Sequence, residues 1–121
     1  MARSLTEAER QLISAMITSA KATDPDHFET QQAWQDWRAG LQEMVDRISA
    51  GAPCDCGKCP SFQLLIDDKP VPAGQSQVIL EAFVSEGIVM LFVDDGQPSY
   101  LEIAPNLDEE LDFPDEKALI F

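Results

Sequence analysis

Positive charge is scarce in this sequence. It has 8 lysine and arginine residues against 22 aspartate and glutamate residues, which gives a formal net charge of −14 at pH 7. Between Lys69 and Lys117 there is no lysine or arginine at all. Binding to a phosphate backbone depends on cationic side chains that release its counterions, and an anionic membrane repels a field of its own sign. We therefore expect no direct binding to nucleic acid and none to membranes.

The sequence also lacks the residues that most enzymes need. His27 is its single histidine, whereas a nucleophilic cysteine site needs a base that a third group orients. Phosphate-cradling glycine loops, a Gly-x-Ser-x-Gly elbow and a His-Glu-x-x-His helix are all missing from the sequence. With no recognisable catalytic constellation, we predict a protein that is not an enzyme.

Long apolar runs are absent as well. The start, "MARSLTEAER", carries charges and is not followed by the apolar stretch of a signal peptide. A membrane helix would need roughly 20 consecutive apolar residues. The only three cysteines fall within six residues, which is unsuited to a disulfide framework and agrees with a reducing compartment. We expect a cytoplasmic protein.

What the sequence does contain is enough for one folded domain. Its 121 residues suffice for a single core, and 45% hydrophobic with 25% charged residues is ordinary globular usage, which argues against disorder. We expect a single domain over residues 1–121. Residues 1–51 should form a helical part, and residues 52–121 a cysteine turn, an antiparallel sheet and an acidic C-terminal segment.

The first half predicts two amphipathic helices. Thr6 and Glu9 stand at the spacing of a capping box. Apolar residues follow at helical spacing, at Leu12, Ile13, Met16, Ile17 and Ala20. A second stripe ends before Gly51 and comprises Trp34, Trp37, Leu41, Met44, Val45 and Ile48. Gly51 stands where a left-handed residue would end this helix, and we interpret the tryptophans as core residues.

The second half predicts strands. Four short apolar runs, "FQLLI", "VILEAFV", "IVMLFV" and "SYLEI", are rich in branched and aromatic residues and are separated by Pro, Gly or Asp. The links Ser85–Gly87 and Asp94–Pro98 are short enough for tight hairpins, so the last three strands should form an antiparallel meander. The expected fold class is α+β, with two N-terminal helices packed on one face of an antiparallel sheet of about four strands.

The segment "CDCGKC" holds all three cysteines, Cys54, Cys56 and Cys59. A turn can bring their sulfur atoms together, but tetrahedral zinc needs a fourth ligand. His27 and Asp55 are the candidates for that ligand, because a second Cys-x2-Cys pair is missing. The other interpretation is a tight turn whose thiols are partly buried. Zinc, or another soft metal that thiolates bind, is the one cofactor that the sequence suggests.

Acidic residues dominate the second half, with eleven between Lys69 and Lys117. Such a run is often a solvated face; it can also be a docking surface for a basic protein partner. Phe113 lies inside the acidic run "DEELDFPDE" and would give such a surface an apolar anchor. The residues that we predict for partner binding are Asp94, Asp95, Asp108, Glu109, Glu110, Asp112 and Phe113.

The pattern "CDCGKCPSF…IVMLFVDDGQPSYLEI…FP" resembles a group of small actinobacterial proteins of uncharacterised function. They share a Cys-x-Cys-Gly turn, an LFVDDG hairpin, an LEI segment and a closing FP. The resemblance covers residues 54–114 and implies a bacterial protein, but no reaction, cofactor or ligand. This sequence departs from the pattern at Lys58, which precedes the third cysteine and changes the cysteine spacing.

These observations lead to one leading hypothesis and two alternatives. We hypothesise a small acidic cytoplasmic protein that binds another protein through its acidic C-terminal half, as an immunity protein or an inhibitor does. The first alternative is a zinc-binding module built on Cys54, Cys56 and Cys59. The second is a DNA-mimic inhibitor, which requires two rows of carboxylates at phosphate-like spacing.

Overall fold

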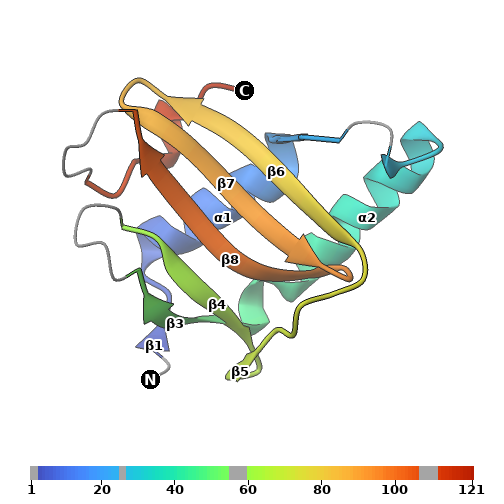
Figure 1. Ribbon diagram of the computed structural model, residues 1–121, viewed down its shortest axis with the longest axis horizontal. Helices are drawn as coiled ribbons and strands as arrows, with labels where there is room; N and C mark the ends of the chain where they lie inside the picture. Colours follow the sequence, from blue (N-terminus) through green and yellow to red (C-terminus); the bar gives the residue numbers. More distant parts are fainter. Residues whose placement is uncertain (1–2, 25–26, 55–59, 107–111) are drawn as a thin grey trace.

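The computed structural model describes residues 3–24, 27–54, 60–106 and 112–121. Two helices, α1 (Glu7–Ser19) and α2 (Gln31–Met44), lie on one side of an antiparallel sheet (Figure 1). The strands are β1 (Arg3–Ser4), β2 (Lys21–Ala22), β3 (Ile48–Pro53), β4 (Phe62–Ile66), β5 (Lys69–Pro70), β6 (Gln77–Val84), β7 (Gly87–Asp94) and β8 (Gln97–Pro105). Two 3₁₀ turns, η2 (Val45–Arg47) and η3 (Glu116–Ala118), complete the described elements.

The strands follow the order β1-β3-β4-β8-β7-β6-β2 across the sheet, and β5 pairs with β4 outside this path. Every pair is antiparallel. The predicted meander of the last three strands is confirmed. Its second hairpin turns at Asp95 and Gly96, whose positive φ angles of 47° and 81° are those of a type I′ turn.

The predicted fold class is wrong in its sheet and in the placement of its helices. The sheet of the described residues has eight strands rather than about four. The helices are not both N-terminal to the sheet, because β1 precedes α1 and β2 lies between α1 and α2. Strands β1, β2 and β5 are two residues long, and such short segments carry no alternation that a sequence pattern can reveal.

Strand β3 was missed for a different reason. Ile48 continues the helical stripe of α2 in the sequence, but the helix ends at Met44 and the backbone at Ile48 is extended, with φ −85° and ψ 132°. Gly51 therefore lies within a strand paired with β4 and does not end a helix. Residues 1–51 accordingly contain strands as well as helices.

Helix α1 begins at the predicted capping box. The Thr6 hydroxyl accepts a hydrogen bond from the Glu9 N–H at 3.1 Å, and the Glu9 carboxylate accepts one from the Thr6 N–H at 2.9 Å. The Arg3 guanidinium donates to both oxygens of the same carboxylate, at 2.7 and 2.8 Å. Two backbone N–H groups at the helix start are thus satisfied, and β1 is tied to the helix that follows it.

Replacing Thr6 by alanine should lower the free energy of unfolding by about 1 kcal/mol, because the Glu9 N–H loses its acceptor at the start of α1. The measurement is urea denaturation followed by circular dichroism. Thr18→Ala is the matched control, since this exposed hydroxyl bonds only the Ser14 carbonyl within the same helix. Equal unfolding midpoints for Thr6→Ala and the wild type would contradict this role of the cap.

The core lies between the helices and the sheet. Its largest fully buried side chains come from both layers, namely Leu12, Ile13, Met16, Ile17, Leu41, Leu64, Leu80, Val89, Leu91, Val93, Leu101 and Ile103. Trp34 and Trp37 are half-buried and pack against this core from its rim. Neither helix in the described part of the chain has the length and apolar composition that crossing a lipid bilayer requires.

Candidate functional site

The described part of the cysteine segment is Cys54, which follows β3. Its side chain is half-buried, and its backbone N–H donates to the Ser61 carbonyl at 2.8 Å. Asp55, Cys56 and Cys59 lie outside the described residues, so the zinc prediction stays a prediction. His27 is exposed and its ring meets Phe28 edge-on at 4.9 Å. The described residues hold no group of three or more His, Cys, Asp or Glu side chains arranged to bind a metal.

Asp94 and Asp95 are occupied within the molecule. Asp94 is only 7% exposed and its carboxylate accepts hydrogen bonds from the Gly74 N–H, the Gln77 amide and the Ser99 hydroxyl. The Asp95 carboxylate accepts from the N–H groups of residues 75 and 76 at 3.3 and 3.0 Å. These two side chains hold the link before β6 against the turn between β7 and β8. Burial leaves the Asp94 carboxylate little surface for a partner, whereas Asp95 is exposed and its role in partner binding stays a prediction.

The hydrogen bonds also decide the ionisation of Asp94. Burial raises the pKa of its carboxyl, but hydrogen bonds from Ser99, Gly74 and Gln77 oppose burial and hold the pKa below its ordinary value. The carboxylate is therefore charged at neutral pH and serves as a triple acceptor.

The other residues predicted for partner binding lie in or near the acidic run. Asp112 is exposed, whereas Phe113 is half-buried and packs against the core of its own molecule. Asp108, Glu109 and Glu110 lie outside the described residues. Farther along, Ile120 bonds to Phe83 of β6 through both backbone groups, at 2.7 and 2.9 Å. The C-terminal segment thus contributes to the edge of the sheet.

The face of the sheet away from the helices carries a different set of side chains. Along β6 and β7 buried residues alternate with less buried ones, as a strand with one face on a core requires. The pairing register aligns the outward residues of β6, β7 and β8 in three rows: Ile79, Phe92 and Tyr100; Glu81, Met90 and Glu102; Phe83, Ile88 and Ala104. We call these nine residues the outer face.

The outer face is apolar and open. Seven of its nine residues are apolar or aromatic, the exceptions being Glu81 and Glu102. Figure 1 views the molecule from this side: both helices lie behind the sheet, and no described helix or strand crosses in front of β6, β7 and β8. Phe83 is 48% exposed, and the other eight residues are partly exposed. Phe92 and Tyr100 meet edge-on with ring centres 6.2 Å apart.

The sequence held a signal for this face that the charge pattern obscured. A strand with one face in water normally alternates apolar and polar residues, while a near-continuous apolar run is typical of a strand covered on both faces. The runs "VILEAFV" and "IVMLFV" contain one charged residue between them. These runs therefore indicated that the strands carry apolar side chains on both faces of the sheet, including the face opposite the core.

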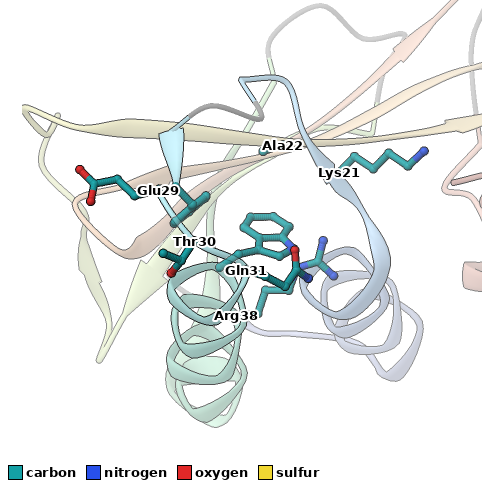
Figure 2. A pocket seen from close by; sticks show the side chains of 8 residues that line it. Lys21, Ala22, Glu29, Thr30, Gln31 and Arg38 are labelled. Atoms are coloured by element: carbon teal, nitrogen blue, oxygen red, sulfur yellow. The ribbon is translucent and has the colours of Figure 1, made fainter.

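A cavity of about 440 Å³ lies on another part of the surface, between β2 and the start of α2 (Figure 2). The Arg38 guanidinium stacks over the Trp34 indole at 4.0 Å and donates to the carbonyls of Thr18 and Ala20. These carbonyls are at the C-terminal end of α1, where a cation complements the helix dipole. The Lys21 ammonium points away from the indole. Arg38 thus serves to join the two helices.

Comparison with known proteins adds no relative to these observations, because no protein-family model, no curated protein and no solved structure matches the chain.

Proposed function

We propose that this protein is a non-enzymatic protein-binding module, acting in the manner of an immunity protein or an inhibitor, and that it docks through the outer face. The observation that carries the proposal is the apolar outer face in a chain whose net charge is −14. A sheet face that only water covers would be expected to carry polar side chains.

The composition of the outer face fits a protein interface. Exposed apolar patches rimmed by polar residues are typical of interaction sites, and aromatic side chains and methionine are enriched in interface cores. The outer face supplies Phe83, Phe92, Tyr100 and Met90 from neighbouring strands. It spans about 14 Å along the strands and about 10 Å across them. An area of this size suits the apolar centre of an interface, which a polar rim surrounds.

This proposal keeps the protein-binding hypothesis and moves its centre. The carboxylates of Asp94 and Asp95 accept hydrogen bonds from residues 74–77 and Ser99 of the same molecule, whereas Glu81 and Glu102 lie on the outer face. DNA mimicry, which requires two rows of carboxylates at phosphate-like spacing, stays an alternative; three of the described carboxylates, Glu9, Asp46 and Asp67, are in ion pairs with arginine.

Site-specific photocrosslinking in the native host tests the proposal. A photoreactive residue at Met90 should give a discrete crosslinked product, while the same residue at Glu43, exposed on α2, should not. Excess wild-type protein should compete for the product, and the double variant Ile88→Ser/Phe92→Ser should compete at least about tenfold less well. Its far-UV circular dichroism should be unchanged because both side chains point away from the core.

Two results would sink the proposal. One is an equal pattern of products from positions 90 and 43. The other is full competition by the folded double variant, which would mean that the outer face takes no part in binding.

A further inference from the structure

The central row of the outer face differs from the rows beside it. Glu81 is paired with Met90, and Met90 with Glu102. Directly paired residues of antiparallel strands project from the same face, and neighbouring strands are about 4.8 Å apart. The two glutamates therefore bracket the Met90 thioether, with their Cα atoms roughly 10 Å apart. Apolar rows lie on both sides of them.

The two carboxylates have little compensation from the molecule itself. Within the described residues the ion pairs are Arg3–Glu9, Arg10–Asp46 and Arg47–Asp67, and none involves the outer face. Lys21 of β2 is paired in register with Glu81, which makes it the neighbouring cation, but no ion pair joins them. The central row thus carries a net negative charge in the middle of an apolar surface.

That charge determines what can cover the face. A carboxylate taken out of water without a partner is strongly unfavourable, so a protein that docks here must bring cations to this row. A guanidinium suits the place best, because it is planar, bonds carboxylates with two N–H groups and stacks on aromatic rings. Phe92 and Tyr100 supply such rings in the adjoining row.

A second copy of this chain fits the face poorly. In a two-fold dimer the same patch meets itself, so the two central rows would bring four glutamates and two Lys21 side chains together. Two carboxylates would stay uncompensated, and each copy carries a net charge of −14. Like charges brought together oppose self-association.

We infer that the outer face receives a protein partner that inserts an arginine, flanked by apolar side chains, over Met90 between Glu81 and Glu102. This inference rests on the proposed function and specifies the partner for that same surface.

The test uses two blocked tripeptides as probes, acetyl-Phe-Arg-Phe-amide and its citrulline analogue, which has the same shape without the charge. Nuclear magnetic resonance should show the arginine peptide shifting the Met90 methyl signal and the neighbouring amides of β6, β7 and β8. The citrulline peptide should bind about tenfold more weakly. Added salt should weaken the binding of the arginine peptide and leave the binding of the citrulline peptide nearly unchanged.

Three variants sharpen the test. In the double variant Glu81→Gln/Glu102→Gln, the affinity for the arginine peptide should fall to the affinity for the citrulline peptide. Asp36→Asn/Glu43→Gln removes the same charge from exposed positions of α2, behind the sheet, and should change the affinity by less than about twofold. Lys21→Ala should raise the affinity for the arginine peptide by about twofold, because it removes, beside Glu81, a positive charge that repels the arginine of the peptide.

Equal affinity for the two peptides, or no shift of Met90 with either peptide, would overturn the inference. So would a dimer, detected by analytical ultracentrifugation, that Glu81→Gln/Glu102→Gln makes more stable, because the occupant would then be a second copy. Photocrosslinking at position 90 is independent of the arginine. A crosslinked product at position 90 together with equal affinities for the two peptides would support the outer face as the docking surface and contradict only the inference about the arginine.

Discussion

Replacing Gly87 by alanine is expected to destabilise the fold by about 3 kcal/mol. A Cβ atom at this position would overlap the carbonyl oxygen of Ala104 and lie 3.1 Å from its carbonyl carbon and 3.2 Å from the Cα of Pro105. These are backbone atoms of β8, which cannot rotate away as a side chain can. Relieving the overlap would open the pairing of β7 with β8, where Gly87 lies opposite Pro105.

Gly40→Ala is the matched control for this substitution. Gly40 lies inside α2, and a Cβ atom there would meet nothing within 4 Å. Alanine should stabilise the helix by about 1 kcal/mol, because glycine in a helix interior loses more backbone entropy on folding. The two glycines should thus shift the urea midpoint in opposite directions. If both substitutions shifted the midpoint in the same direction, the close contact of Gly87 with β8 would not explain the effect of Gly87→Ala on stability.

The parts of the fold that sequence could predict are those with a long local pattern. The capping box and apolar stripe of α1 are present as predicted, as is the meander of β6, β7 and β8. The missed strands depend on partners distant in the chain. Arg3 and Ser4 are a strand only because Ala50 and Ser49 lie beside them, and a pattern within the segment cannot reveal this pairing.

The same distinction applies to the candidate site. Asp94 and Asp95 were predicted to bind a partner on the basis of charge alone. In the structure Asp94 is buried and Asp95 is exposed, and both carboxylates accept hydrogen bonds from the link at residues 74–77, which folds back over the turn. That contact joins residues about 20 positions apart and has no local sequence signature. The outer face, by contrast, has a local sequence signal, because the apolar runs of β6 and β7 lack the polar residues that alternation would place on a face in water. Ile79 and Phe83 stand at positions where a strand with one face in water would carry polar residues.

Replacing Asp94 by alanine should lower the free energy of unfolding at neutral pH by about 3 kcal/mol, because three hydrogen-bond donors lose a charged acceptor in a largely buried place. Asp112→Ala, which removes the same charge from an exposed position, should change it by less than about 0.5 kcal/mol. The measurement is urea denaturation of both variants beside the wild type. Similar small losses in both would mean that the link at residues 74–77 does not depend on Asp94.

The pH dependence gives an independent check with a fixed sign. The pKa of Asp94 is lowered in the folded protein from an ordinary value of 3.8, so its charged form stabilises the fold fully above that value. This contribution is lost as the pH falls from about 4 through the lowered pKa. Asp94→Asn cannot ionise, so the wild type should lose its stability advantage over this variant within that window. An advantage that stayed constant down to pH 2 would show that neutral hydrogen bonding, and not the charge of Asp94, holds the link to the turn.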